Sequence, residues 1–357
     1  MKTWARFSTI ILLLLLVLLP SQLINKKTVT QASDIEIERI VINYEYSSDY
    51  FKENRFSKTG NQFDAGYSGF RILYKDKIIP FELFSIFVAP NEEVVFAPER
   101  PRLLSSLQLF SGDLPSKFFS DSGWVVTAPS EPGMYPIDFF DVNSQSFMRI
   151  KLFVTVPADQ IVDGWLNGYR IGSYPDEPLN GNPAYNPPSG FIEVTPENMN
   201  TRISPHFTLG QFLCKQEGGF PKYMVLQDRL ILQRESVLQI SNQNGYNAPT
   251  FHIMSGYRTP WYNQNIGNGR YSRHIYGDAA DIFIDFRQKN GRMDDLNKDG
   301  VIDIKDAIVL HEIIDGLQRT SKKHYHKGGL GLYGNRPWRG PFVHVDGRGH
   351  YARWQLN

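Results

Sequence analysis

Cysteine is nearly absent from this chain: Cys214 is the single one among 357 residues. One thiol excludes both an intramolecular disulfide framework and a metal cluster held by cysteines alone. An excess of charge of one sign is absent too, because 38 basic residues stand against 37 acidic ones, for a net charge of +1. This balance excludes a protein that holds nucleic acid through a broad basic field, so we expect no nucleic-acid partner.

Long hydrophobic runs are also absent, with one exception at the N-terminus. Residues 10–19 are all apolar, Lys2 and Arg6 precede them, and Pro20 ends the run. A charged start followed by a short apolar run is typical of a secretory signal. We therefore expect residues 1–33 to be a signal peptide or an uncleaved membrane anchor, and the protein to be exported to the periplasm, the cell wall or the exterior.

The next part of the chain, residues 34–158, has the pattern of an all-β domain. Short runs of β-branched and aromatic residues alternate with turn residues, and no long helical period interrupts them. The runs are Ile35, Ile37 and residues 41–46, 69–74, 81–88, 124–127 and 147–156. We predict an immunoglobulin-like sandwich that serves as a spacer or contacts the cell wall, because no catalytic set of residues lies here.

Residues 159–200 are rich in proline, glycine and asparagine, as in the Asn-Pro-Pro-Ser-Gly stretch at 186–190. Such punctuation makes regular secondary structure improbable, so the sequence predicts a connector. Four aromatic residues could pin this connector to a neighbouring domain: Trp165, Tyr169, Tyr174 and Tyr185. A helical pattern at residues 223–241 follows, inside a second folded domain over 201–357.

Residues 272–281 place a histidine, His274, and a carboxylate, Asp281, seven positions apart with small residues between them. Imidazole nitrogen and carboxylate oxygen are both good zinc ligands, and a catalytic zinc site takes three protein ligands. Residues 342–346 offer the third in His344. Side chains on a strand alternate, so Asp346 projects from the same face as His344 and its carboxylate could lie near the attacking water.

The joint pattern Ser272-x-His274-x-x-Gly277-x-Ala279-x-Asp281, followed by His344, resembles the zinc D-Ala-D-Ala carboxypeptidase family. That family also includes D,D-dipeptidases, murein endopeptidases and the hedgehog signalling fold. Further similar segments lie at residues 207–212, 255–260, 329–333 and 342–346, so the resemblance covers about residues 204–357. It implies an α+β peptidase domain with a small antiparallel sheet and flanking helices.

The resemblance also implies roles for individual residues. Zinc would be held by His274, Asp281 and His344, and the reaction would be metal-assisted hydrolysis of a peptidoglycan peptide. Arg258 would bind the substrate's carboxylate or a nearby carbonyl through its planar donor fork. From the same motifs, Ser272 would hydrogen-bond within the site and Tyr257 would contact substrate.

One position departs from the family pattern. Many members carry a glutamate base three residues before the last histidine, and here that residue is Pro341. We therefore nominate Asp346 as the base that takes a proton from the attacking water. The alternative is that Asp346 forms a structural ion pair with Arg348 or Arg353, which leaves the base unidentified.

Residues 295–306 predict a second metal site, of a different kind. Oxygen ligands on alternate residues, a turn glycine at Gly300 and a terminal carboxylate match a calcium-binding EF-hand loop and resemble a dockerin loop. The expected ligands are Asp295, Asn297, Asp299, the carbonyl of Val301, and Asp306. We predict a structural calcium ion in this loop, inserted within the peptidase domain. The alternative is an acidic surface turn that binds nothing.

Three functions fit these patterns. The first is a zinc metallopeptidase that acts on cell-wall peptides as a D,D-carboxypeptidase or murein endopeptidase. The second is a non-catalytic wall-binding or scaffold protein built on the peptidase fold, and Pro341 favours it. The third, a calcium-dependent adhesion protein, rests on the β domain and the calcium loop alone. The sequence leaves open which wall bond is cut and which oligomeric state the protein adopts.

Overall fold

The computed structural model describes residues 63–321 and 327–356. The expected signal or anchor segment, residues 1–33, and the first expected strands, within residues 35–46, lie outside this range. Residues 61–357 form one compact unit. Among the residues described, no helix has the length and apolar character needed to cross a membrane.

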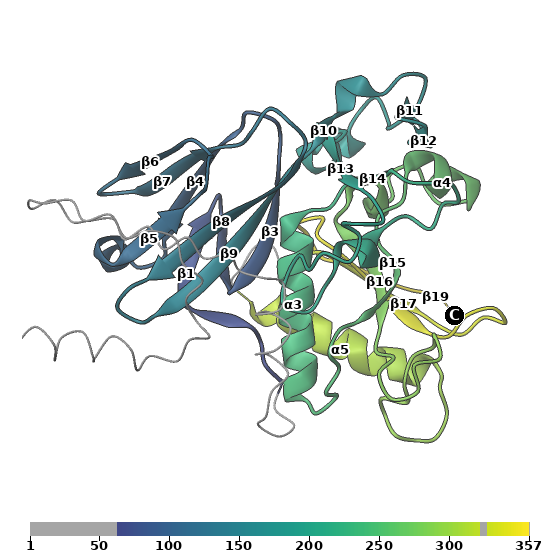
Figure 1. Ribbon diagram of the computed structural model, residues 1–357. Coiled ribbons are helices and arrows are strands. Elements are labelled where there is room, and N and C mark those ends of the chain that lie inside the picture. Colours follow the sequence, from purple (N-terminus) through teal and green to yellow (C-terminus); the bar gives the residue numbers. More distant parts are fainter. Residues whose placement is uncertain (1–62, 322–326, 357) are drawn as a thin grey trace, which may run out of the picture. The chain divides into compact units, whose positions relative to one another are not determined.

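The N-terminal part of this unit is built from strands arranged in two sheets (Figure 1). The first sheet has the order β2-β1-β4-β7-β6 and the second the order β3-β9-β8-β5. The strands of the first are β2 (Lys77–Phe81), β1 (Tyr67–Tyr74), β4 (Glu93–Pro98), β7 (Gly123–Thr127) and β6 (Ser116–Phe119). Those of the second are β3 (Leu83–Val88), β9 (Ser146–Val154), β8 (Gly133–Asp141) and β5 (Leu107–Phe110).

Aromatic side chains join the two sheets. Phe139 on β8 meets Phe96 on β4 edge to face at a centroid distance of 5.5 Å, and it meets Trp124 on β7 at 5.6 Å. Edge-to-face packing of buried rings adds about 0.5–1.5 kcal/mol per pair to the free energy of burial. The expected sheet-rich region is therefore present, and its immunoglobulin-like character stays a prediction.

The segment expected to be a connector contains more regular structure than its composition predicts. It carries the two-residue strands β11 (Trp165–Leu166) and β12 (Tyr169–Arg170) and the longer strand β13 (Gly190–Val194). β13 lies between β10 (Val156–Pro157) and β14 (Lys222–Met224). The prediction of an irregular segment is wrong for β13, because pairing with distant strands supplies the hydrogen bonds that the local sequence does not predict.

Of the four expected aromatic anchors, three are enclosed. Tyr169 and Tyr185 are buried, and the Tyr174 hydroxyl donates to the carbonyl of Ile275 at 2.9 Å. Trp165 differs, because its side chain is 44% exposed. The aromatic residues therefore attach this segment to the C-terminal part of the chain, as expected, but not through Trp165.

The C-terminal sheet has the order β15-β16-β18-β17-β19 (Figure 1). Its strands are β15 (His252–Ser255), β16 (Ala279–Phe283), β18 (Phe342–Asp346), β17 (Gly329–Tyr333) and β19 (Ala352–Leu356). The expected antiparallel sheet needs one correction, since β19 runs parallel to β17. Both edges of β18 are occupied, by β16 and β17, so the chain that leaves β18 adds at the outer edge of β17.

Two long helices accompany this sheet. α3 (Asp228–Gln243) begins five residues later than the expected helix, because Lys222–Met224 pairs as strand β14. α5 (Ile304–Thr320) packs against β17 and β18 and against α3. Its inward side buries Leu310 and Ile314, and each such side chain contributes about 1.5–3 kcal/mol on burial. Short helical segments complete this part: η5 (Leu209–Phe212), α4 (Pro260–Asn265) and η6 (Arg273–Tyr276).

Candidate metal centre

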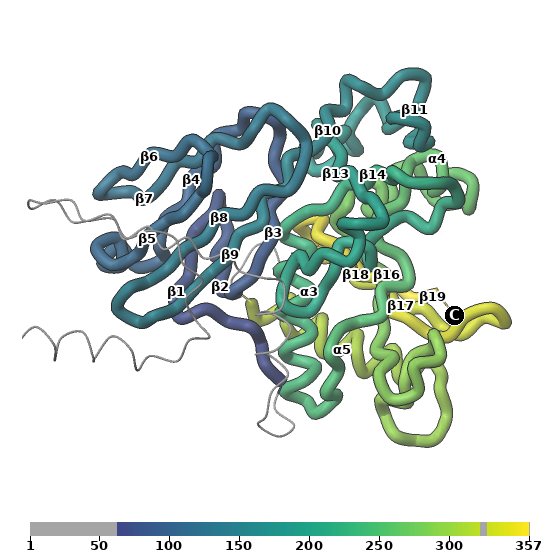
Figure 2. The backbone as a smooth tube through the Cα atoms, in the orientation of Figure 1, coloured from purple at the N-terminus to yellow at the C-terminus, as the bar shows by residue number. Residues whose placement is uncertain are grey.

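Three segments, two of them close in sequence and the third about 60 residues further along, place the predicted zinc ligands together. Asp281 on β16 and His344 on β18 are direct cross-strand partners, and the two strands run side by side in Figure 2. His274 lies in η6, which ends at Gly277 with φ of +69°. A side chain at Gly277 would collide with the Val225 carbonyl, so glycine permits the tight reversal from η6 into β16.

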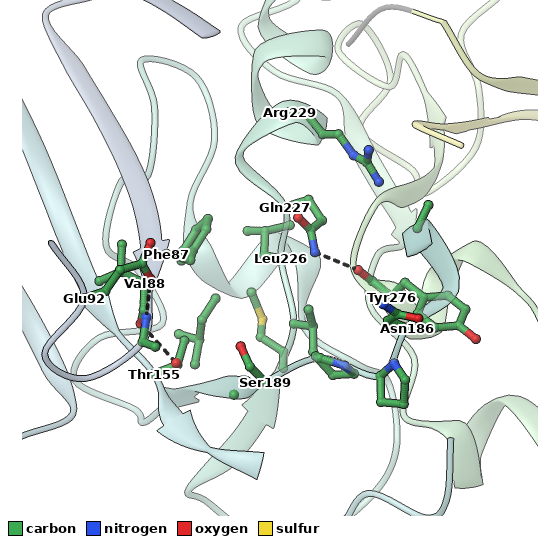
Figure 3. Close-up of a pocket in the computed structure, with 18 of the residues that line it drawn as sticks. Phe87, Val88, Glu92, Thr155, Asn186, Ser189, Leu226, Gln227, Arg229 and Tyr276 are labelled. Atoms are coloured by element: carbon green, nitrogen blue, oxygen red, sulfur yellow. Dashed lines mark hydrogen bonds between the residues drawn. The ribbon is translucent and has the colours of Figure 1, made fainter. Parts of the chain in front are cut away.

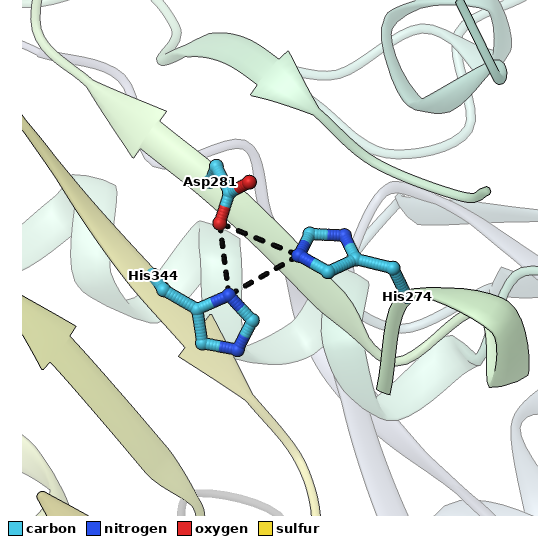
Figure 4. Close-up of side chains that lie close together, drawn as sticks. All are labelled: His274, Asp281 and His344. Carbon is cyan, nitrogen blue, oxygen red and sulfur yellow. Dashed lines mark hydrogen bonds and ion pairs between the residues drawn. The ribbon is translucent and has the colours of Figure 1, made fainter. Parts of the chain in front are cut away.

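The three side chains point toward one another, as Figure 4 shows. His344 Nδ1 lies 2.8 Å from Asp281 Oδ1, and His274 Nε2 lies 3.3 Å from the same oxygen. The two ring nitrogens, His274 Nε2 and His344 Nδ1, are 3.2 Å apart. Zinc bonds of about 2.0–2.1 Å in tetrahedral geometry place ligand atoms about 3.3 Å apart, so this triangle fits a zinc ion closely.

Each of these three residues has an outer partner that fixes its orientation. His274 Nδ1 donates to the Gly256 carbonyl at 2.6 Å, which leaves Nε2 facing the cluster. Asp281 Oδ2 accepts from Arg258 Nη2 at 2.6 Å, which leaves Oδ1 facing the cluster. His344 Nε2 faces Asp346 Oδ2 at 3.1 Å, which leaves Nδ1 inside. Metal ligands are usually held by such outer hydrogen bonds, which set their orientation and basicity.

The electrostatics of the cluster follow from burial and from these contacts. Burial lowers the pKa of His274. Burial would raise the pKa of Asp281, but the two histidines and Arg258 outweigh it and hold that pKa well below its usual range. Burial likewise opposes a charge on His344, yet hydrogen bonds to Asp281 and Asp346 raise its pKa to about 9. Without a metal, His344 therefore carries a proton at neutral pH.

Asp346 does not lie where a base would be needed. Its side chain is fully buried and contacts the ring nitrogen of His344 that faces away from the cluster. Arg348 Nη2 donates to Asp346 Oδ2 at 2.6 Å, and the Gly329 N–H donates to Oδ1 at 2.9 Å. Burial would raise the pKa of Asp346, but His344 and Arg348 hold it well below its usual range. This geometry favours the ion pair with Arg348 and a role in orienting His344.

The other residues expected at the site are placed as follows. Arg353 pairs with Asp315 on α5, at 2.7 Å between Nε and Oδ1, so it is not the partner of Asp346. Arg258 lies at the cluster, bound to Asp281. Ser272 precedes η6, where its side chain makes no capping hydrogen bond.

Tyr257 is fully buried, and its hydroxyl lies 3.1 Å from the hydroxyl of Tyr174. Its neighbour Arg258 reaches the cluster instead, where it donates to Asp281. The expected contact between Tyr257 and substrate is therefore not supported by its position.

Two residues beside the cluster, Trp354 and Arg339, were not singled out from the sequence. The Trp354 ring lies 5.2 Å from the His344 ring, and its Nε1 donates to the Tyr333 hydroxyl at 2.9 Å. The Arg339 guanidinium lies over the Phe342 ring at 4.6 Å. Gly331, the direct neighbour of both His344 and Trp354 across the sheet, has no side chain, and a Cβ there would meet the Trp354 ring. A glycine opposite a ligand histidine is the one sequence signal for this close approach of the Trp354 ring.

The predicted calcium loop forms a turn before α5. Asp299 Oδ1 accepts from the Val301 N–H, and Asp295 Oδ2 accepts from the Gly300 N–H, both at 2.9 Å. Asp306 is fully buried, and its carboxylate accepts from the N–H groups of Leu296, Asn297 and Asp303. Asp295 Oδ1 is buried and has no hydrogen-bond partner among the described residues. That orphaned oxygen fits a cation ligand.

A cavity of about 410 Å³ lies away from the metal cluster (Figure 3). Thr155, Gln227, Arg229 and Tyr276 are among the residues that line it, and the Gln227 side chain donates to the Tyr276 carbonyl at 3.3 Å. None of the three candidate ligands lines this cavity. Its volume therefore identifies no substrate site, and the candidate centre is defined by the His-Asp-His geometry.

Comparison with known proteins places this centre in context. The family model described as Peptidase M15 matches residues 205–297. The match confirms, for that segment, the resemblance to zinc D-Ala-D-Ala carboxypeptidases, and at family level it supports a metallopeptidase. It contains His274 and Asp281, whereas His344 lies beyond its end. No curated protein and no solved structure matches the chain.

Proposed function

We propose, from the Peptidase M15 match of residues 205–297, that this protein is a zinc-dependent hydrolase of D-amino-acid-containing peptides of the bacterial cell wall. The proposal rests on one observation above all. His274 Nε2, Asp281 Oδ1 and His344 Nδ1 form a buried triangle with sides of 2.8–3.3 Å, which is the spacing of three ligands around zinc.

When bound, zinc would lower the pKa of a water molecule and polarise the scissile carbonyl. The residues of the chain supply orientation and charge. Asp346, held by Arg348, orients the His344 ring so that Nδ1 faces inward. Arg258 neutralises the outer oxygen of Asp281, and as a planar donor fork it can also bind a substrate carboxylate or carbonyl.

We further propose that the protein acts outside the cytoplasm, where its substrate is found. The charged start and apolar run within residues 1–33 support export, either with cleavage or with an N-terminal membrane anchor. Both forms bring the peptidase domain to peptidoglycan, which is the partner that the proposed activity requires.

Release of D-alanine from a synthetic wall pentapeptide tests the proposed activity. The zinc-loaded protein should release D-alanine or cut a cross-linked dimer of the same peptide. Removal of metal with a chelator should abolish cleavage, and added zinc should restore it. The control variant is Asp315→Asn, which removes a carboxylate on α5 that pairs with arginine outside the cluster and should cleave the peptide as the wild type does. The proposal would be contradicted if the zinc-loaded protein left both the pentapeptide and the cross-linked dimer intact.

A second candidate function is a non-catalytic module that recognises wall peptides. Pro341 stands where many members of the resembled family carry a glutamate base, and proline offers no proton acceptor. The geometry of Asp346 strengthens this candidate, because its carboxylate is already bound by Arg348, Gly329 and His344. The same pentapeptide separates the two functions. A module would bind the peptide with zinc present and leave it uncut.

We also propose that calcium stabilises the loop at residues 295–306 without taking part in catalysis. The orphaned Asp295 Oδ1 supports this, since a buried carboxylate oxygen is costly without a partner. Asp299 and the Val301 carbonyl lie on the ligand positions of the motif. The loop immediately precedes α5, so calcium bound there would order the start of the helix that packs under β17 and β18.

A further inference from the structure

The loop between β17 and β18 carries the most exposed large apolar side chain among the described residues. Trp338 is 79% exposed. Exposed single aliphatic side chains are common on protein surfaces, but tryptophan is highly buried on average. Its large flat face, free in solvent, is available to a ligand.

The loop that carries Trp338 is held in one conformation. The backbone N–H groups of Arg336 and Arg339 each donate to the other residue's carbonyl, at 2.9 and 3.1 Å. Arg339 Nη1 donates to the Gly334 carbonyl at 2.6 Å, and its guanidinium lies over the Phe342 ring. The Asn335 side chain donates to the Ile302 carbonyl at 2.9 Å. A fixed loop loses little conformational entropy when its exposed ring binds a ligand.

This loop is close to the candidate metal centre. Phe342 precedes His344 by two residues on the same strand, a rise of about 7 Å. The four residues from 342 back to 338 reach at most about 14 Å further, so the backbones of Trp338 and His344 are at most about 21 Å apart. Arg339, next to Trp338, also interacts electrostatically with Asp281.

The chemistry around the indole favours a carbohydrate. Its neighbours Asn335 and Arg336 are exposed and polar. The contacts that exclude water around a protein-binding hot spot are therefore missing here. An indole face packs against the C–H groups of a sugar ring, while an amide and a guanidinium can hydrogen-bond to hydroxyl, acetamido and carboxylate oxygens. Amino sugars offer both kinds of surface.

We infer that Trp338, with Arg336 beside it, is a subsite for the amino-sugar strand to which a wall peptide is attached. The inference rests on the proposed function for the substrate class. A peptide stem of about four or five residues in extended form spans about 13–18 Å, which is comparable with the upper limit of about 21 Å between the two backbones. The subsite gives the protein a preference for glycan-bearing peptides over free ones.

Hydrolysis of one wall peptide in two forms, free and attached to its disaccharide, tests this preference. For the wild type, kcat/KM should be higher for the glycan-bearing form, and in Trp338→Ala the ratio of the two should fall about three- to tenfold. Most of this change should come from a higher KM of Trp338→Ala for the glycan-bearing peptide. Phe118→Ala, which removes a 52% exposed ring on β6, is the control and should leave the ratio unchanged. An unchanged ratio in Trp338→Ala would overturn the inference.

Binding of peptide-free glycan strands tests the subsite without turnover, so its failure is distinct from failure of the proposed hydrolysis. In calorimetric titration of the full chain, the wild type and Phe118→Ala should bind equally, and Trp338→Ala about three- to tenfold more weakly. Trp338→Phe, which keeps an aromatic face, should recover part of the loss. The subsite is rejected by absence of binding to the wild type, or by equal binding to Trp338→Ala.

Discussion

The two predicted metal sites are held in different ways. The His274–Asp281–His344 cluster is assembled from η6, β16 and β18, and an outer hydrogen bond holds each ligand. The loop at residues 295–306 draws its donors from twelve consecutive residues, and its carboxylates bind mostly the loop's own N–H groups. The cluster therefore depends on the packing of the whole domain, whereas the loop depends on a local turn.

Removal of a carboxylate from each site should expose this difference most strongly. Asp281→Asn takes away the partner of Arg258 and His344 inside a buried cluster, so the free energy of unfolding without metal should fall by about 3–5 kcal/mol. Asp299→Asn removes an exposed surface charge that is screened by solvent, so its effect on the free energy of unfolding should be far smaller. Urea unfolding in the presence of a chelator measures both values. Equal losses would contradict the distinction.

Protons should compete with zinc for the His274–Asp281–His344 cluster. Without metal, the pKa of His344 is raised to about 9, so zinc must displace a proton at any lower pH. Zinc affinity should fall about tenfold per unit as the pH drops from about 9 toward 7. The stabilisation from that proton is present below about pH 6.5 and disappears as the pH rises through about 9. Chelator competition at several pH values measures the affinity, and a flat profile would exclude this protonation.

Asp346→Asn separates an orienting role from a base. An orienting carboxylate predicts a loss of about 10- to 100-fold in zinc affinity, with turnover largely retained in the zinc-loaded fraction. A general base predicts normal zinc content and a fall in turnover of about 100- to 10,000-fold. Zinc affinity and turnover should be measured on the same sample, with Asp315→Asn as the matched control. We expect the first outcome, because Asp346 contacts the outward nitrogen of His344.

The sequence alone predicted part of the zinc centre. The spacing of His274 and Asp281, together with a late histidine, predicted the three ligand candidates, because the family motif encodes the strand register that joins them. It did not predict that His344 presents Nδ1. That choice depends on the side-chain rotamer and on Arg348, which holds Asp346.

Other features of the fold were beyond local patterns for a similar reason. The burial of Tyr257 and the parallel addition of β19 follow from which neighbours are already occupied in the folded domain. The strand pattern of residues 69–74 and 124–127 was readable because side chains alternate between buried and more exposed positions there, and in 147–156 the alternation holds as far as residue 152. Strand β13 was missed, because its partners are distant and its flanking residues indicate turns.

The smallest expected effect concerns the calcium loop. At calcium about ten times the dissociation constant, binding should stabilise the protein by about 1.4 kcal/mol and raise the melting temperature. Asp299→Ala should remove this rise and leave zinc content unchanged. Asp285→Ala, which removes a carboxylate that binds the N–H groups of Asn290 and Gly291 in a nearby loop, should keep it. A melting temperature independent of calcium in the wild type would leave the loop as an empty acidic turn.

Zinc content is the most direct test of the cluster itself. His344→Ala removes one of the three ligands, and His350→Ala removes an exposed histidine six residues further along the chain. After dialysis against a weak chelator, the wild type and His350→Ala should each retain about one zinc per molecule, and His344→Ala should retain almost none. Equal zinc in His344→Ala and the wild type would contradict the assignment of the metal centre.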